Sequence, residues 1–366
     1  MSHEKVKIYK RRKMMITLNP KKFFLNNVKQ VEICLENNGE ITTYLMMKDE
    51  KGVFKYENDK DIPYTNYYFK IDGKNYCSHK LEYVVISTMS SGKSTFINSL
   101  VGDEIMPSEN QACTGKIFKL ENSLGNQKDS MYIKKNGKLK RYYLDKEILR
   151  ELNSDSQIDE IGVQTKYFNM KNNITIYDTP GINNFQDHLH KEITYNFLEK
   201  AKIKNIIYII NATQIGTNDD KLFLLDIEEL KQKKDMKIMF ILNKIDSLDE
   251  KNENKENVIE NVKKYLKENK FENYSIFPLS AYCAKLVRKA LKNNIETRKE
   301  KLDLTTYYNL SLISESFEND EHIIIKNSTF SKKKLEQMLE ESGILAIEKA
   351  MQNINEFYPT FSLKIM

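Results

Sequence analysis

Apolar residues follow different patterns in the two parts of this chain. Before about residue 80 they alternate with polar residues in short runs, as in Val6–Ile8, Val31–Ile33 and Tyr67–Ile71. Turn residues such as Asp72-Gly73 separate the runs. This alternation is typical of half-buried strands. We therefore predict a small β-rich, sandwich-like domain over residues 1–80, with a structural or partner-docking role.

From Leu81 onward, short apolar runs alternate with longer amphipathic segments. This order predicts an α/β domain over residues 81–366, with a mostly parallel sheet and helices on both faces. The expected strands are Tyr83–Ile86, Ile174–Tyr177, Asn205–Ile210, Lys237–Leu242 and Tyr274–Leu279. The expected helices are Thr95–Val101, Lys191–Ala201, Asp219–Lys231 and Asn257–Lys267.

Two insertions interrupt the alternation, near residues 115–170 and 284–335. The first predicts a hairpin made by Met131–Lys135 and Lys140–Tyr143, followed by a short helix over Lys146–Leu152. The second predicts helices with a polar break near Glu318–Glu321. A last helix is expected over Lys333–Phe357, with a bend or break at Ser342-Gly343.

Composition narrows the class of protein. The sequence has 58 Lys and Arg against 52 Asp and Glu, and a net charge of +6, which is too mild to argue for a nucleic-acid or membrane partner. Its four cysteines form no CxxC pair, which favours free thiols in a reducing compartment. No signal peptide or run of apolar residues of membrane-spanning length is apparent, so a cytoplasmic protein is expected.

A phosphate-binding loop is predicted between the first strand and helix of this domain. The sequence Ser87-Thr-Met-Ser-Ser-Gly92-Lys93-Ser94 provides backbone N–H groups and a helix N-terminus for phosphates. Lys93 is expected on the β- and γ-phosphates, and the Ser94 hydroxyl on Mg²⁺. Ser91, Gly92 and Thr95 complete this half of the nucleotide site. Ser87 stands where the motif usually has its first glycine.

Three further elements follow later strands in the order typical of GTPases. Asp178-Thr-Pro-Gly181 predicts a carboxylate that holds Mg²⁺ through water, and a glycine N–H beside the γ-phosphate. Asn243-Lys244-Ile-Asp246 predicts guanine recognition, because the Asp246 carboxylate accepts hydrogen bonds from N1–H and the 2-amino group, which adenine lacks. Ser280-Ala281 is expected to offer a backbone N–H to guanine O6.

The switch and the water-positioning group are harder to locate. Thr114 is the best candidate for a threonine that senses Mg²⁺ and orders around the γ-phosphate, and a loop residue without that role is the alternative. Ile182 follows Gly181, where Ras-like enzymes carry a catalytic glutamine. The attacking water must therefore be positioned from elsewhere.

The sequence around these motifs resembles the dynamin family of GTPases, and bacterial dynamin-like proteins in particular. The resemblance covers about residues 81–357. It is carried by Ser90–Asn98, Leu100-Val101-Gly102, Met106-Pro107 with Thr114, Asn211–Asp220 and Ser342–Glu348.

This resemblance implies Mg²⁺-dependent GTP hydrolysis, stimulated when two copies form a nucleotide-dependent homodimer. It also implies that Ser90 helps to position the catalytic water and a monovalent cation, K⁺ or Na⁺. Met89 departs from the polar residue of eukaryotic members. No long helical stalk follows the G domain in this sequence, so peripheral membrane association is expected to need a partner protein that supplies a helical or membrane-binding part.

Two other functions remain open at this stage. The chain could be a nucleotide-gated binding switch with little turnover, which the lack of a Ras-type glutamine favours. It could also be a ribosome- or RNA-associated GTPase, although no aromatic residues interleave with its basic clusters in an RNA-binding pattern.

Overall fold

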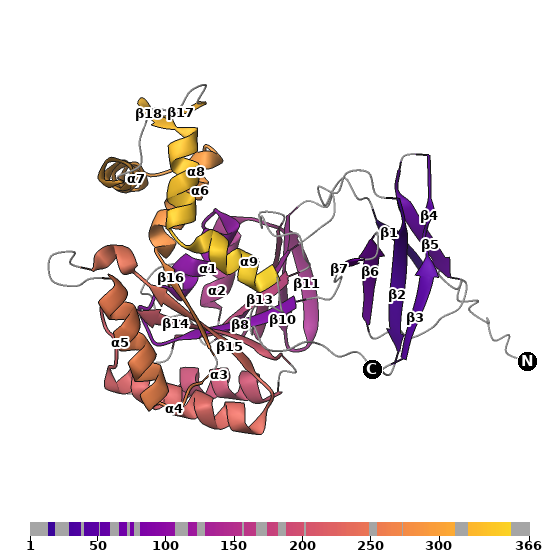
Figure 1. Ribbon diagram of the computed structural model, residues 1–366, viewed down its shortest axis with the longest axis horizontal. Coiled ribbons are helices and arrows are strands. Elements are labelled where there is room, and N and C mark those ends of the chain that lie inside the picture. Colours follow the sequence, from indigo (N-terminus) through magenta and orange to yellow (C-terminus); the bar gives the residue numbers. More distant parts are fainter. Residues whose placement is uncertain are drawn as a thin grey trace, which may run out of the picture. The chain divides into compact units, whose positions relative to one another are not determined.

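The structure, a computed structural model, describes residues 14–18, 29–37, 40–50, 52–58, 66–71, 74–76, 81–106, 116–122, 129–155, 157–165, 174–181, 188–200, 203–248, 255–272, 274–311 and 321–352. These residues fall into two compact units, one within residues 1–80 and the other within residues 81–170 and 174–366 (Figure 1). None of the described helices combines enough length with enough apolar character to span a lipid bilayer.

The smaller unit is built from antiparallel strands, which confirms the prediction of a β-rich region. One sheet has the order β1-β5-β4 and the other β3-β2-β6-β7. The rings of Tyr44 and Tyr56, one from each sheet, lie 5.1 Å apart. The strand expected at Val6–Ile8 lies outside the described residues. The strands are β1 (Met14–Leu18), β2 (Val31–Asn37), β3 (Glu40–Leu45), β4 (Met47–Lys48), β5 (Phe54–Asn58), β6 (Asn66–Ile71) and β7 (Lys74–Tyr76).

The larger unit is organised around a nine-stranded sheet in the order β11-β10-β12-β9-β13-β8-β14-β15-β16. The five strands from β13 to β16 in this order are parallel to one another, whereas β13 is antiparallel to β9. These are the strands predicted from the apolar runs. The strands are β8 (Leu81–Ser87), β9 (Ile117–Asn122), β10 (Ser130–Lys135), β11 (Lys138–Tyr143), β12 (Glu160–Thr165), β13 (Ile174–Asp178), β14 (Asn205–Asn211), β15 (Lys237–Asn243) and β16 (Ser275–Leu279).

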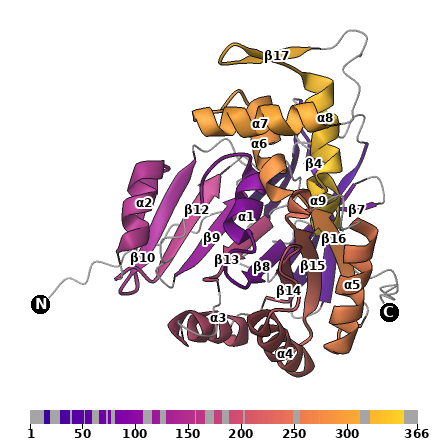
Figure 2. The same cartoon turned by 90° about the vertical axis from the view of Figure 1, so that its left-hand side faces the viewer.

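Helices cover both faces of this sheet. Because successive side chains of a strand point to opposite faces, a strand of this sheet contributes to a separate core on each face. On β8, Tyr83 and Val85 pack into the core beneath α1 and α6, whereas Val84 and Ile86 pack into the core beneath α3, α4 and α5 (Figure 2). The predicted mostly parallel α/β architecture is confirmed. The helices are α1 (Lys93–Val101), α2 (Lys146–Ser154), α3 (His188–Lys200), α4 (Asn218–Lys233), α5 (Lys255–Glu268), α6 (Ala281–Leu291), α7 (Arg298–Leu310), α8 (Lys332–Glu341) and α9 (Ile344–Gln352).

The segment around residues 115–170 contributes to the main sheet itself. The predicted hairpin is present as β10 and β11, and helix α2 follows it. The sequence pattern did not reveal β9 and β12, which pair in parallel with each other and join the hairpin to β13.

The segment around residues 284–335 differs from the expected run of helices. Helices α6 and α7 are present, but residues 322–331 form an antiparallel hairpin of β17 (His322–Ile325) and β18 (Ser328–Ser331). Lys326 and Asn327 both have positive φ angles, of 44° and 65°, as a tight hairpin turn requires. The helical expectation for this stretch was therefore wrong. The run of three isoleucines before an Asn-containing turn was the available signal.

The expected break at Ser342-Gly343 separates α8 from α9. Gly343 has a φ of 87°, and a Cβ atom there would lie 2.1 Å from the carbonyl oxygen of Pro278. The N–H of Ser280 donates to the carbonyl of Ser342 at 2.9 Å. The break therefore packs directly against the end of β16.

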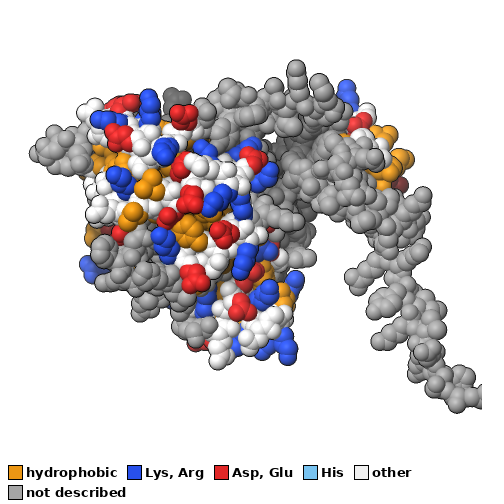
Figure 3. All heavy atoms as spheres, turned by 90° about the horizontal axis from the view of Figure 1, so that it is seen from below, with side chains coloured by type: hydrophobic (Ala, Val, Ile, Leu, Met, Phe, Trp, Pro, Cys, Tyr) orange, Lys and Arg blue, Asp and Glu red, His pale blue; other side chains and the backbone are white. Residues whose placement is uncertain are grey.

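Charges of both signs are interspersed on the face that carries α3 and α4 (Figure 3). Ion pairs join Lys191 to Asp226 and Lys204 to Asp235, at 2.8 and 2.9 Å. Exposed pairs of this kind contribute little to stability. Their mixed signs give this face no extended field of one sign.

Candidate functional site

Four predicted motifs lie at neighbouring strand ends on one edge of the sheet. Residues 88–92 follow β8, Asp178 ends β13, Asn243 ends β15 and Ser280 follows β16. Because β13, β8, β14, β15 and β16 are adjacent and parallel, their carboxyl ends meet along this edge. Ligands of open α/β sheets bind at such an edge.

The loop between β8 and α1 is tightly turned. Ser90 has a φ of 59° and Gly92 a φ of 89°, and the hydroxyls of Thr88 and Ser91 lie 3.0 Å apart. A Cβ atom on Gly92 would lie 2.2 Å from Nδ2 of Asn243. Only glycine fits at this position, both because of its left-handed backbone and because of the close approach of Asn243.

Two helices begin at this edge without a side-chain cap. Neither Gly92, before α1, nor Ser280, before α6, makes a capping side-chain hydrogen bond, although the first N–H of α6 donates to Asn243. Helices α2, α4, α7 and α8 are instead capped by Asp145, Thr217, Thr297 and Ser331. Uncapped N–H groups and the positive end of the helix dipole form an anion-binding site. Of these six α-helices, the two without a capping side chain at the N-cap position are the two that start at predicted nucleotide motifs.

Asn243 joins the two halves of the site. Its Nδ2 donates to the carbonyl of Ser91 at 2.9 Å, and its Oδ1 accepts from the N–H of Ala281 at 3.1 Å. The side chain is buried, and both ends of its amide are used. Asn243 therefore fixes the phosphate-binding loop against the start of α6.

Lys93 and Asp178 form an ion pair of 2.7 Å at the centre of the site. Burial raises the pKa of the Asp178 carboxyl, and the ammonium of Lys93 opposes this shift. Thr179 anchors the following turn, since its hydroxyl donates to the carbonyl of Val85 at 2.9 Å. Gly181 then lies beside Met89, because a Cβ atom on Gly181 would be 3.4 Å from Cγ of Met89.

Ser94 and Thr95 lie in the first turn of α1, partly buried. Thr114 and Ile182 lie outside the described residues, so the switch prediction stays a prediction. Among the described residues, no group of three or more His, Cys, Asp or Glu side chains comes together as a metal site would require.

The other end of the site surrounds Asp246. This residue lies exposed in a short 3₁₀ helix, Ile245–Ser247, after Lys244, whose φ is 66°. A pocket of about 230 Å³ opens beside it. Burial and the charge of Asp246 raise the pKa of the Cys283 thiol in this pocket to about 12, which keeps it neutral. The pocket is lined by Ile245, Asp246, Lys255, Ser280, Cys283, Tyr307, Leu310, Ser311, Met338, Glu341 and Ser342.

Tyr307, on α7, was not singled out by the sequence. Its hydroxyl donates to Oδ2 of Asp246 at 2.6 Å. The two residues are 61 positions apart, so no local pattern could have indicated the contact.

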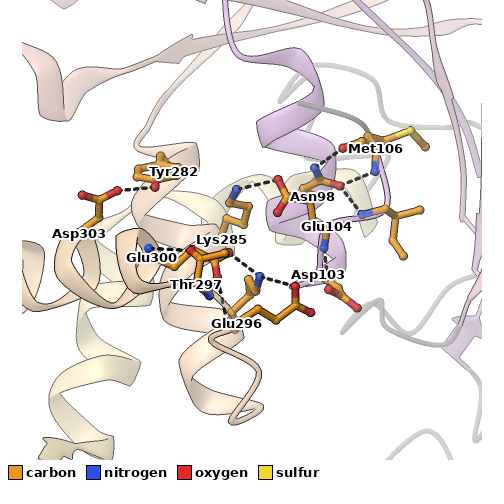
Figure 4. Close-up of polar contacts among 12 residues, drawn as sticks. Asn98, Asp103, Glu104, Met106, Tyr282, Lys285, Glu296, Thr297, Glu300 and Asp303 are labelled. Atoms are coloured by element: carbon orange, nitrogen blue, oxygen red, sulfur yellow. Dashed lines mark hydrogen bonds and ion pairs between the residues drawn. The ribbon is translucent and has the colours of Figure 1, made fainter. Parts of the chain in front are cut away.

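A polar network holds the chain that leaves α1 toward Thr114 (Figure 4). The buried Asn98 side chain accepts from the N–H groups of Ile105 and Met106 and donates to the Met106 carbonyl. Glu104 pairs with Lys285 of α6 at 3.4 Å. Residues 103–106 are therefore anchored to α1 and α6, immediately before the segment that contains Thr114.

Residues 84–245 match the sequence model of the Dynamin family. The chain is also 26% identical over 310 residues to an uncharacterized protein in the xynA 3′ region of Caldicellulosiruptor sp. (strain Rt8B.4), which covers 77% of this chain and 73% of that protein.

The solved structures that the chain matches include two of an oligomerised bacterial dynamin pair. Their TM-scores are 0.45 and 0.42, with 19% and 17% identity over 76% of this chain. The chain spans only 42% and 44% of their length. An Era variant from Aquifex aeolicus bound to GDP and AlF4⁻ matches with a TM-score of 0.33 and 18% identity. The match covers 67% of this chain and 61% of the Era chain.

The family match spans the phosphate-binding loop, Asp178 and Asn243, and so agrees with the resemblance seen in the sequence. Residues 84–245 therefore match the dynamin family, and the larger unit has the fold of a P-loop, GTP-binding G domain.

Proposed function

We propose that the larger unit binds GTP with Mg²⁺ and hydrolyses it to GDP and phosphate, and that two copies dimerise across their nucleotides to do so. The observation that carries this proposal is the meeting, at one sheet edge, of an uncapped helix start at Gly92-Lys93 and an exposed carboxylate at Asp246. The first suits phosphates and the second suits guanine.

The phosphates would lie against the N–H groups of residues 90–95, with Lys93 on the β- and γ-oxygens. Lys93 would then exchange the Asp178 carboxylate, at 2.7 Å, for phosphate oxygens. Because the new partners carry more negative charge, the exchange favours the bound state. It also releases Asp178 for the metal.

Mg²⁺ suits the donors that this exchange leaves. It prefers oxygen ligands, keeps several waters, and needs only one or two protein groups beside the phosphates. The Ser94 hydroxyl would bind it directly, Asp178 through a water, and Thr114 would close the shell in the GTP state. Mg²⁺ would neutralise charge on the phosphates, and this does not require a cluster of three acidic residues.

Hydrolysis requires a water in line with the γ-phosphorus. The water oxygen forms the new bond, the bond to the β–γ bridging oxygen breaks, and GDP and phosphate leave with release of a proton. Ser90 and the Gly181 N–H are the proposed groups around this water and the γ-phosphate. A K⁺ or Na⁺ ion beside Ser90 is part of the proposal, and replacing both ions by choline tests it.

The base would lie between Asp246, the stem of Lys244 and the start of α6, where the Ala281 N–H would be shared between Asn243 and guanine O6. We expect GTP to bind more tightly than ATP by roughly 2–4 kcal/mol, on the order of 30- to 1000-fold. The measurement is titration calorimetry, with Asp246→Asn, which should favour xanthosine nucleotides, as the matched variant. Lys93→Ala should abolish turnover in the same preparations. Equal affinity for GTP and ATP in the unmodified protein would overturn the proposal.

Dimerisation would supply what a single copy lacks. Ile182 replaces the catalytic glutamine, so a second copy is proposed to order the loop around Thr114 and exclude water. Specific activity should rise with protein concentration and reach a plateau, and light scattering should detect a dimer with GDP and aluminium fluoride but not with GDP.

A flat rate per molecule from nanomolar to tens of micromolar, with a monomer in each nucleotide state, would leave a nucleotide-gated switch as the better function. Single-turnover hydrolysis separates that switch from an enzyme. We further propose that the unit within residues 1–80 is a separate docking domain, and that peripheral association with a membrane uses a partner protein.

A further inference from the structure

The hydrogen bond between Tyr307 and Asp246 has a defined direction. A carboxylate can only accept, so the phenol donates, at 2.6 Å to Oδ2. Burial and the neighbouring Asp246 raise the pKa of Tyr307 above its ordinary value, so the phenol keeps its proton at neutral pH. Asp246 is therefore held from one side by a neutral donor.

Helix α7 is a well-fixed support for this donor. Its N-terminus carries a capping box, in which the side chains of Thr297 and Glu300 each accept a hydrogen bond from the other's backbone N–H. Glu300 also pairs with the buried Lys289. At the other end, the Tyr308 hydroxyl accepts from the N–H of Ser331 at 2.9 Å. A capped and doubly anchored helix presents Tyr307 in one place.

The ring of Tyr307 is fixed as well. It packs edge-on against Tyr282 of α6, with ring centroids 6.3 Å apart. Tyr282 in turn donates to Asp303 of α7 at 2.6 Å, in the contact labelled in Figure 4. The two tyrosines thus join α6, which begins at the predicted base loop, to α7.

Guanine uses both oxygens of such a carboxylate, one for N1–H and one for the 2-amino group. A carboxylate offers about four acceptor positions, so one bond from Tyr307 leaves Oδ1 and a second position on Oδ2 for the base. It also restricts rotation of the carboxylate about its bond to Cβ. A base that needs both oxygens in one plane benefits from that restriction, whereas a base that needs one oxygen does not.

We propose that Tyr307 is a positioning residue for guanine recognition, whose hydroxyl sets the plane of the Asp246 carboxylate so that both oxygens face the base. This inference rests on the proposed GTP function. It assigns α7, which lies outside the four sequence motifs, as a wall of the base pocket, and it makes the 2-amino group the part of the substrate on which Tyr307 acts.

The experiment measures GDP and IDP affinity by titration calorimetry. IDP carries inosine, which has N1–H but no 2-amino group. Tyr307→Phe should weaken GDP about 3- to 10-fold, the loss expected for a partly exposed bond to a charged group. The affinity for IDP should fall about threefold less than the affinity for GDP, so the preference for GDP over IDP decreases. A role in folding alone would not change that ratio.

Tyr282→Phe is the matched control. It removes a hydroxyl-to-carboxylate bond of the same 2.6 Å length but leaves Asp246 untouched and keeps the ring against Tyr307. The GDP-to-IDP preference should be unchanged. In the Asp246→Ala background, Tyr307→Phe should cause no further loss of GDP affinity, because its effect passes through Asp246.

Two results would overturn the inference. An unchanged GDP-to-IDP preference in Tyr307→Phe would show that the hydroxyl does not orient the carboxylate. Tighter GDP binding would show that Tyr307 competes with the base. If Asp246→Ala itself leaves GDP affinity unchanged, the proposed guanine site fails first, and that result is distinct from both.

Discussion

The two ends of helix α1 are completed in different ways. At its start, Gly92 adopts a left-handed backbone, no side chain caps the first turn, and no acidic residue lies in that turn. At its end, Arg288 donates to the carbonyls of Ser99 and Leu100, and Lys292 donates to that of Val101. The start of α1 keeps its N–H groups available for a ligand, whereas the carbonyls at its end accept hydrogen bonds from Arg288 and Lys292.

This difference indicates which end serves a ligand. A helix that only supports a fold gains about 1 kcal/mol from a capping side chain at its start, and α1 forgoes it. The positive end of its dipole then faces the site, while cations from α6 complement the negative end. The sequence of α1 has no basic residue in its last turn, so α6 supplies those charges.

The sharpest way to break this comparison is a matched pair of glycine substitutions. Gly92→Ala puts a Cβ 2.2 Å from the Asn243 amide, in a left-handed backbone. It should displace Asn243 and break its hydrogen bonds to Ser91 and Ala281. The affinity for GTP should fall by about 10³-fold or more, about 4 kcal/mol. Calorimetry measures the affinity, and thermal unfolding confirms that the domain is folded.

Gly102→Ala is the counterpart at the other end. It has a φ of 66°, and its Cβ would lie 2.9 Å from Cβ of Arg288. It should lower the free energy of unfolding by about 1–2 kcal/mol and leave GTP affinity within about twofold. If Gly102→Ala reduces GTP affinity as much as Gly92→Ala does, the two ends do not differ in function.

The next largest effect concerns the cation that fills the end of α1. Arg288 is buried and also pairs with the buried Glu348 of α9 at 2.7 Å. Arg288→Met leaves this carboxylate without its partner, and should lower the free energy of unfolding by about 3 kcal/mol. Urea unfolding measures it.

Arg288→Met combined with Glu348→Leu removes both charges and should recover part of that loss, because a buried apolar pair costs less than one unpaired charge. Nucleotide affinity should stay near that of the unmodified protein in both variants. A double variant no more stable than the single one would show that the loss of the carbonyl bonds to Ser99 and Leu100, which both variants share, outweighs the unpaired carboxylate.

The contrast between the ends of α1 also separates what the sequence could predict from what it could not. The four motifs and the five parallel strands were predictable because each depends on a short run of residues, such as Ile238–Leu242 before Asn243. The cations at the end of α1 were not, since Arg288 and Lys292 lie 188–191 positions from their partners. Tyr307 was missed for the same reason. Such contacts depend on how helices pack, which local periodicity does not encode.

The smallest effect is a pH dependence at the end of α1. Burial and then the neighbouring Arg288 lower the pKa of Lys292 from its ordinary 10.5 to about 8. Between about pH 8 and 10.5 the unfolded chain therefore holds a proton on Lys292 that the folded chain releases, so stability from this group rises with pH across that window. Because Lys292 is an exposed residue, although its Nζ donates to the Val101 carbonyl at 2.6 Å, we expect less than about 1 kcal/mol.

Urea unfolding of the unmodified protein and of Lys292→Met at pH 7.5, 8.5 and 9.5 measures this pH dependence as the difference between the two stability curves, since other titrating groups are common to both. Cys283, with a pKa raised by burial to about 12, contributes a slope of the opposite sign above pH 9 and cancels in that difference. If the difference stays constant with pH, Lys292 is charged throughout, and the end of α1 is completed by two permanent cations rather than by one cation and one titrating amine.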